Sequence, residues 1–95
     1  MRRAAKHDGN HHEMTRAAES IGCTVFDLAG VGDGFPDLLI LTPGGRLVLV
    51  EVKAPGKLDD LTPDEVDWWA AYDGPGFISD NVQNLSIMLR EIDSE

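Results

Sequence analysis

Residues 37–53 have the sequence DLLILTPGGRLVLVEVK, in which two apolar runs flank a short polar segment. The runs Asp37–Leu41 and Arg46–Lys53 have the length and apolar content of β-strands. The Thr-Pro-Gly-Gly between them has the composition of a tight turn, so this stretch predicts an antiparallel hairpin. We take Pro43–Gly45 as the turn, which places Gly44 at the centre of the pairing.

The predicted register of this hairpin puts two carboxylates side by side. Reflection about Gly44 places Asp37 opposite Glu51, and the two-residue period of a strand puts Lys53 on the same face. Like charges directly opposed on a sheet are destabilising by up to about 1 kcal/mol, so this pairing requires a cation between them. Hard oxygen ligands favour Mg²⁺ or Mn²⁺ over zinc, which predicts a site for one of these metals.

Other interpretations of these charges stay open. Edge strands often carry charged residues that discourage aggregation, and Asp37, which follows Pro36, is also suited to capping a loop. A shift of one residue in the turn would separate Asp37 from Glu51.

The rest of the chain predicts helices and strands on both sides of the hairpin. Asn10 to Glu13 and Thr62 to Glu65 both have the pattern of a helix capping box, and Ser79 or Asp80 is suited to cap a last helix. The predicted order is αβββαβα: helix 10–21, strands 23–28, 37–41 and 46–53, helix 63–73, a strand over 76–79, and a helix through residues 82–92.

Length and composition fit one small domain over residues 1–95. The chain has 95 residues, of which 42% are hydrophobic, and a formal net charge of -9. No apolar run approaches the ~20 residues of a membrane span, and the first residues lead into a polar segment, so we expect a cytoplasmic protein without a signal peptide. Cys23 is the only cysteine, which excludes an intramolecular disulfide and predicts a small buried side chain.

The acidic charge is concentrated in the second half of the chain. Residues 1–53 have a net charge of -1, whereas residues 54–95 have a net charge of -8. Affinity for a polyanion comes largely from Lys and Arg side chains that neutralise phosphates, so the total charge argues against a nucleic-acid partner. A stripe of basic side chains on one face would remove this objection. The candidate members of this basic stripe are Arg2, Arg3, Lys6, Arg16, Lys53 and Lys57, and residues 1–9 are a candidate flexible basic arm.

Three motifs together resemble the PD-(D/E)XK nuclease superfamily, and specifically its VRR-NUC branch in stand-alone, phage-type form. The motifs are GDGFPDLLI over residues 32–40, LVEVK over residues 49–53, and LTP over residues 61–63. The resemblance covers residues 10–92 and implies an α/β fold with a restriction-endonuclease-like αβββαβ core, a small mixed sheet flanked by helices. The order of elements predicted above agrees with it.

The resemblance also implies roles for single residues. Asp37, Glu51 and the backbone carbonyl of Val52 would ligate Mg²⁺ or Mn²⁺, and Lys53 would orient or activate the attacking water. A glutamate of the first helix, here Glu13, would complete the catalytic and metal-binding set. The implied reaction is metal-dependent hydrolysis of a phosphodiester bond by in-line attack of a water activated at the metal. Glu13 also has a structural interpretation, as the last residue of the first capping box.

One position departs from the pattern of the family. Related proteins often carry Gln in the helix after Leu-Thr-Pro, where this chain has Glu65. Glu65 either forms an ion pair with Lys53 or only completes the capping box of Thr62, and the capping role is the simpler interpretation.

We therefore expect a DNA endonuclease that acts on branched or structured DNA, such as Holliday junctions or flaps, as a homodimer. The resemblance places it in a bacterium or a phage-infected host cell, with no small-molecule cofactor. No base-reading motif is present, so recognition by DNA shape and phosphates is expected. The alternative is a catalytically weak nuclease-fold module or subunit that acts through a protein partner, with an exposed Trp68 or Trp69 in its surface.

Overall fold

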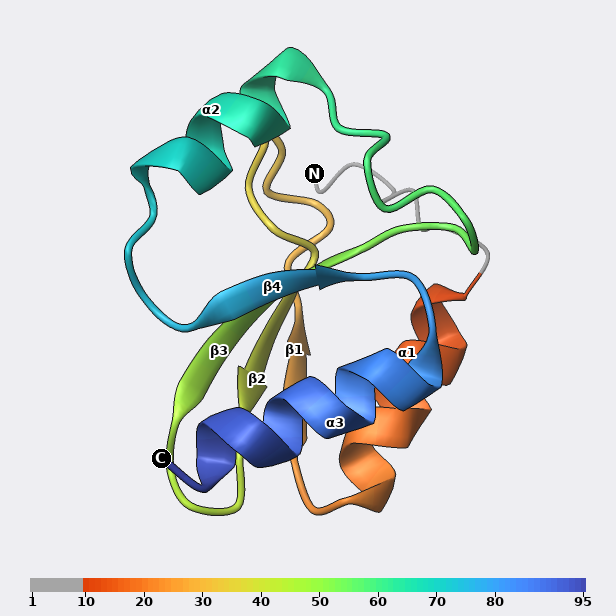
Figure 1. The fold of residues 1–95 in the computed structure, drawn as a ribbon, viewed down its shortest axis with the longest axis vertical. Helices are drawn as coiled ribbons and strands as arrows, with labels where there is room; N and C mark the ends of the chain where they lie inside the picture. The colour runs from red at the N-terminus through yellow and green to blue at the C-terminus, as the bar shows by residue number, and fades with distance from the viewer. Residues whose placement is uncertain (1–9) are drawn as a thin grey trace.

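The computed structural model describes residues 10–95 and has the predicted order αβββαβα (Figure 1). Its helices are 10, 9 and 12 residues long, and within this range none combines the length and the apolarity that crossing a membrane requires. The elements are α1 (His11–Ser20), β1 (Thr24–Asp27), β2 (Leu38–Leu41), β3 (Leu47–Val52), α2 (Pro63–Ala71), β4 (Gly76–Ser79) and α3 (Val82–Asp93).

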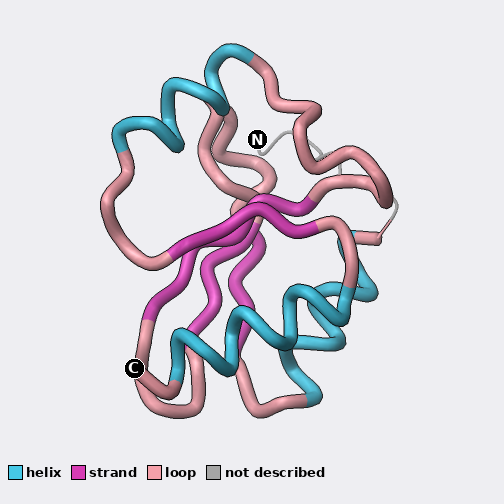
Figure 2. Tube along the Cα trace, viewed as in Figure 1, coloured by secondary structure: helices cyan, strands magenta, loops and turns pink. Residues whose placement is uncertain are grey.

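The four strands form one mixed sheet in the order β1-β2-β3-β4. Neighbours β1, β2 and β3 are antiparallel, whereas β4 runs parallel to β3 because α2 lies in the connection between them. Helices α1 and α3 pack against each other and against the two edge strands, and α2 lies on the opposite side of the sheet (Figures 1 and 2). The fold is therefore α/β, a small mixed sheet flanked by helices, as predicted.

The core lies between the sheet and the pair of helices α1 and α3. Alternate residues of β3 divide between the two faces, so Val48, Val50 and Val52 are fully buried against the helices while Leu47 is 55% exposed on the other face. The apolar stripes of the two helices supply the opposing side chains, which include Met14, Ala18, Leu85 and Leu89.

The register of the central hairpin is the predicted one. Leu38 pairs with Val50 and Leu41 with Leu47, so the pairing is symmetrical about Gly44. Continued by one residue, this register places Asp37 opposite Glu51 on the face that α1 and α3 leave uncovered.

The predicted capping box at the start of α1 is wrong. Asn10 precedes the helix, but its side chain makes no capping hydrogen bond. Its Nδ2 instead donates to the backbone carbonyl of Asp80 at 2.8 Å, which ties the start of α1 to the end of β4. Glu13 is consequently an exposed residue of the first turn and takes no part in a capping box.

The cap of α3 is also one residue away from its predicted position. Asn81 precedes the helix, and its side-chain oxygen accepts the backbone N–H of Asn84 at 2.8 Å. Asp80 accepts the backbone N–H of Gly56 at 2.8 Å, so it fastens the loop after β3 and does not cap α3.

Cys23 is buried with 7% of its surface exposed, as predicted. Burial raises the pKa of its thiol, and the nearby Asp93 carboxylate raises it further. Cys23 therefore packs as a small apolar residue and is a poor nucleophile.

Candidate active site

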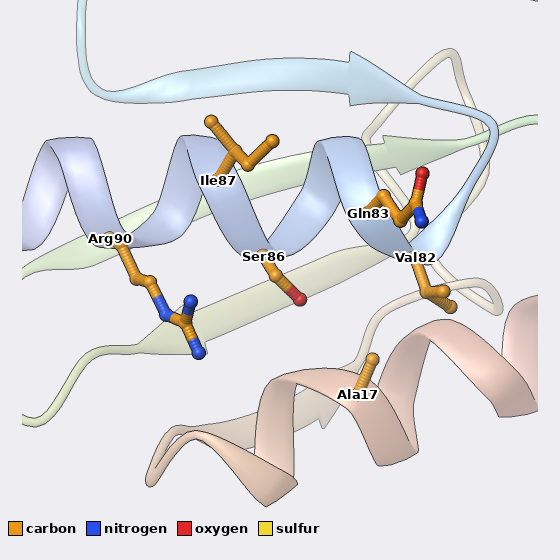
Figure 3. Close-up of a pocket in the computed structure, with 6 residues that line it drawn as sticks. All are labelled: Ala17, Val82, Gln83, Ser86, Ile87 and Arg90. Atoms are coloured by element: carbon orange, nitrogen blue, oxygen red, sulfur yellow. The ribbon is translucent and has the colours of Figure 1, made fainter.

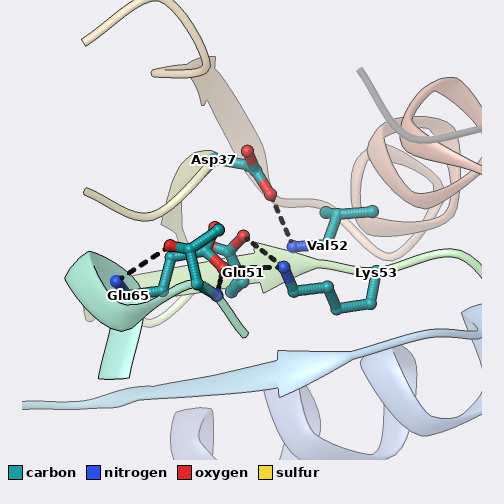
Figure 4. Close-up of polar contacts among 6 residues, drawn as sticks. Asp37, Glu51, Val52, Lys53 and Glu65 are labelled. Carbon is teal, nitrogen blue, oxygen red and sulfur yellow. Dashed lines mark hydrogen bonds and ion pairs between the residues drawn. The ribbon is translucent and has the colours of Figure 1, made fainter. Parts of the chain in front are cut away.

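Acidic side chains from two neighbouring strands meet on the face of the sheet opposite α1 and α3. Asp37 comes directly before β2, while Glu51 lies in β3 and Lys53 follows it. The Oδ2 atom of Asp37 accepts the backbone N–H of Val52 at 2.8 Å, which fixes this carboxylate beside the end of β3 (Figure 4). The structure thus brings together Asp37, Glu51 and Lys53.

A lysine ammonium group lies between two carboxylates in this cluster. The Nζ atom of Lys53 is 2.9 Å from Oε1 of Glu65 and 3.5 Å from Oε2 of Glu51 (Figure 4). Lys53 is 9% exposed and Glu51 3% exposed, so both ionisable groups are largely removed from water. Buried charges are retained when they are paired, and here the second carboxylate comes from α2.

Helix α2 places Glu65 through its N-terminal capping box, which is present as predicted. The Oε1 atom of Glu65 accepts the backbone N–H of Thr62 at 2.9 Å, and the Glu65 N–H donates to the Thr62 hydroxyl at 3.2 Å. Pro63 occupies the first helical position, where no N–H donor is needed. The two roles considered for Glu65 therefore hold at once, because one carboxylate caps α2 and contacts Lys53.

The glycine-rich loop before Asp37 is docked on the start of α2. Gly34 has φ +79, and a Cβ atom there would collide with the backbone carbonyl of Asp64. The next residue, Phe35, meets Trp68 edge to face with 5.3 Å between ring centroids. This packing couples the position of Asp37 to that of α2.

Gly34→Ala is expected to lower the free energy of unfolding by about 2–4 kcal/mol, because it adds both a left-handed-backbone penalty and a collision with α2. Gly32→Ala is the matched control: Gly32 has the same φ of +79 but nothing within 4 Å of the added atom, so a loss of only about 1 kcal/mol is expected. Urea unfolding of both variants measures the difference. Equal losses would contradict the close packing of this loop on α2.

Neither tryptophan of α2 is fully exposed. Trp68 stacks on Tyr72 with 4.7 Å between ring centroids, and Trp69 lies against Gly76 of β4, which has no side chain. The exposed tryptophan that the alternative function would use is therefore not found in the structure.

The environment of Glu51 opposes its ionisation. Burial, the Asp37 charge and the neighbouring Glu65 together raise the pKa of Glu51 to about 9, although Lys53 acts in the opposite direction. Burial alone would also raise the pKa of Glu65, but hydrogen bonds from Lys53 and from the backbone of Thr62 lower it overall. In the absence of a further cation, the cluster thus holds a proton on Glu51 and a negative charge on Glu65.

The donor atoms fit a hard divalent cation. The Oε1 atom of Glu51 is buried and has no hydrogen-bond partner, so it is available to a cation. A metal at this oxygen would remove the repulsion between Glu51 and Asp37 that raises the Glu51 pKa. Mg²⁺ usually keeps several of its waters and is bound through one or two carboxylates, which matches the number of acidic side chains here.

Comparison with protein families places the chain in a known family. The chain matches the family model of the VRR-NUC domain over residues 11–79, from α1 to the end of β4. The chain belongs to the VRR-NUC family. The matched range contains Asp37, Glu51, Lys53 and Glu65, and membership indicates a nuclease-type function. No curated protein and no solved structure shows significant similarity to the chain.

Other predicted site residues of this VRR-NUC protein lie outside the cluster or outside the described range. Glu13 is exposed on α1, and the described contacts of Asp37, Glu51 and Lys53 do not include it. Among the predicted DNA-binding residues, Arg16 and Lys57 are exposed, on α1 and on the loop after β3. Three further members of the predicted basic stripe lie outside the described residues: Arg2, Arg3 and Lys6.

A groove of about 470 Å³ lies elsewhere on the VRR-NUC fold, between α1 and α3 (Figure 3). Its polar side chains are neutral or basic, and no carboxylate lines it, so it has none of the groups that a metal-dependent hydrolase uses. Its lining residues are Ala17, Val82, Gln83, Ser86, Ile87 and Arg90.

Proposed function

We propose that this VRR-NUC protein is a Mg²⁺- or Mn²⁺-dependent DNA endonuclease that acts on branched or structured DNA. The observation that carries the proposal is the cluster of Asp37 with the buried Glu51 and Lys53 at the end of β3, within a chain of this family. Two adjacent carboxylates and an ammonium group are suited to hydrolysis of a phosphodiester, because the reaction needs a bound metal and a cation near the phosphate.

The metal would be held by Asp37, Glu51 and the backbone carbonyl of Val52. When bound, Mg²⁺ or Mn²⁺ supplies a water of lowered pKa and positive charge for the phosphate oxygens. The hydrogen bond from the Val52 N–H keeps the Asp37 carboxylate oriented at the strand end. Asp37, as a metal ligand, would therefore be in position before the metal binds. The buried Oε1 of Glu51 supports the same assignment.

Lys53 would act through its Nζ atom. This atom lies 2.9 Å from the Glu65 carboxylate and beside Glu51, from where the ammonium group can donate hydrogen bonds to the attacking water and to a phosphate oxygen. Because the group is 9% exposed, its charge is weakly screened and stabilises negative charge that develops on the phosphate.

DNA would be recognised by shape and phosphates. The cluster carries three carboxylates and one ammonium group, so a bound metal is needed before a phosphate can approach. The proposed phosphate contacts are Arg2, Arg3, Lys6, Arg16 and Lys57, of which the last two are exposed in the structure.

The protein would act as a homodimer, and the open sheet face supports this proposal. On the face opposite α1 and α3, Phe26 is 48% exposed and Leu47 55% exposed, and Leu39, Leu41 and Leu49 lie between them in the sheet register. Strands that are apolar on both faces usually have both faces covered. The apolar part of this face, away from the carboxylates of the candidate active site, is suited to pair with itself in a two-fold dimer, whereas the rest of a chain with net charge -9 repels its copy.

Leu47→Lys is therefore expected to convert the dimer to a monomer, because it places a charge within this apolar face. Light scattering coupled to size exclusion would give the mass of each form. Ile87→Lys is the matched control, since Ile87 is also 55% exposed but lies on α3, across the sheet. A wild-type monomer, or a dimer that only the control variant dissociates, would contradict this interface.

A cleavage assay tests the function directly. Its labelled substrates are four-way junction, flap, single-stranded and duplex DNA. The protein is incubated with each in Mg²⁺ or Mn²⁺ and in EDTA, and binding is measured in Ca²⁺ to limit cleavage. We expect cleavage of the branched substrates that is lost in EDTA. A folded protein that cuts none of the four DNAs would contradict the proposal and favour the alternative, a nuclease-fold module or subunit that needs a protein partner.

A further inference from the structure

The strongest described contact of Lys53 leads away from its own strand. Its Nζ atom is 2.9 Å from Glu65 on α2, but 3.5 Å from Glu51. A charge-assisted hydrogen bond of 2.9 Å is of ordinary length, whereas 3.5 Å is long for one. The position of the ammonium group is therefore set by α2 more than by β3.

Glu65 is held firmly enough to direct another side chain. The same Oε1 atom that contacts Lys53 also accepts the Thr62 N–H at 2.9 Å, so two donors fix one oxygen. The backbone next to Glu65 is fixed as well, because the carbonyl of Asp64 is packed against Gly34. A side chain locked in this way can position a partner, since its rotamer is already restricted by packing and capping.

We propose that Glu65 is a positioning residue that holds the Lys53 ammonium group in place beside the metal-binding carboxylates. The inference rests on the proposed function, in which Lys53 acts on the water and the phosphate. When a metal binds Glu51, Lys53 still has the Glu65 carboxylate as a partner. Without Glu65, the ammonium group keeps its 3.5 Å contact with Glu51 and would compete with the metal for that carboxylate.

The competing explanation is that Glu65 serves only as a helix cap. Three variants separate the two explanations. Glu65→Ala removes the Lys53 contact and the side-chain half of the capping box, but its backbone N–H can still donate to the Thr62 hydroxyl. Glu65→Gln keeps an oxygen that can accept from both Lys53 and Thr62. Thr62→Ala removes the hydroxyl that accepts the Glu65 N–H but leaves the Thr62 backbone donor and the Lys53 contact.

Single-turnover cleavage, DNA affinity in Ca²⁺ and Mn²⁺ affinity by calorimetry are measured on all four proteins. We expect Glu65→Ala to slow cleavage about 100-fold, the cost of a misplaced catalytic group, with DNA affinity within about twofold of wild type. Mn²⁺ should bind Glu65→Ala several-fold more weakly. Glu65→Gln should recover most of the rate, and Thr62→Ala should melt earlier yet cleave at the wild-type rate.

Wild-type rates and Mn²⁺ affinity in Glu65→Ala would overturn the inference while leaving the nuclease function in place. A rate in Thr62→Ala as low as that of Glu65→Ala would also overturn it, because the cap alone would then explain the loss. If Glu65→Ala does not fold, a rate in Glu65→Gln as low as that of a Lys53 variant overturns it. A wild-type protein inactive on every DNA would instead remove the proposed function, and this inference with it.

Discussion

Glu51→Gln is expected to make the metal-free protein more stable than wild type, by about 1–3 kcal/mol at pH 7. Glu51 is 3% exposed, and its burial, together with the nearby Asp37 and Glu65, raises its pKa to about 9. A neutral amide of the same size avoids the cost of either ionising or protonating the carboxyl group. Lys53 keeps its 2.9 Å contact with Glu65 in this variant, so no buried ammonium group loses its nearer partner.

The pH dependence of stability follows from the same shift. The pKa of Glu51 is about 9 in the folded protein against an ordinary value of 4.5, so the folded state binds the extra proton between these values. The stabilisation from this proton is complete below pH 4.5 and is lost as pH rises toward 9. The lowered pKa of Glu65 acts in another window, since its contribution is lost only as pH falls below its ordinary value of 4.5.

Urea unfolding in EDTA from pH 5 to pH 9 measures this effect. The free energy of unfolding should fall across the range in wild type and should fall less in Glu51→Gln. Glu91→Gln is the control, because Glu91 is an exposed glutamate of α3 and its neutralisation should change stability by less than about 0.5 kcal/mol. A Glu51→Gln variant less stable than wild type in EDTA at pH 7 would contradict the electrostatic account of the cluster.

Lys53→Met is expected to slow DNA cleavage by about 10²–10⁴-fold, the range associated with loss of a proton-transfer or positioning group. It should also lower the free energy of unfolding by about 2–4 kcal/mol, because Glu65 then loses its buried cation. The loss is limited by protonation of Glu51, whose pKa rises further once Lys53 no longer lowers it.

Single-turnover kinetics and urea unfolding of the same preparation test both parts of this prediction. Arg46→Met is the control, since Arg46 is an exposed cation of the same hairpin and lies outside the cluster. A Lys53→Met protein that is folded and cleaves at the wild-type rate would remove Lys53 from the proposed mechanism. An unchanged free energy of unfolding would show that the ion pair with Glu65 contributes little to the fold.

Much of the fold was predictable because it depends on local rules. The composition of the turn centred on Gly44 fixed the register of the hairpin, and that register alone places Asp37 opposite Glu51. The capping pattern of Thr62 and Glu65 likewise predicted where α2 begins. In each case residues close in sequence make the contacts that decide the structure.

The errors arise where distant residues override a local pattern. Asn10 has the right spacing to cap α1 with Glu13, but its side chain donates to Asp80, 70 residues away. The contact between Lys53 and Glu65 depends on how α2 packs across the sheet, which no spacing rule gives. One local feature indicated this contact. Glu65 is the third residue of α2, and the capping box turns its carboxylate back toward Thr62 and the end of the strand.

The most direct test of the nuclease site is the Mg²⁺-dependent cleavage rate of Glu51→Gln beside Glu91→Gln and wild type, on the best DNA substrate. The proposed site predicts that Glu51→Gln, although folded and more stable without metal, cleaves at least about 10³-fold more slowly, as expected when a metal ligand and its electrostatic contribution are lost. Glu91→Gln should cleave at the wild-type rate. Equal rates for all three proteins would contradict the assignment of this cluster as the catalytic centre.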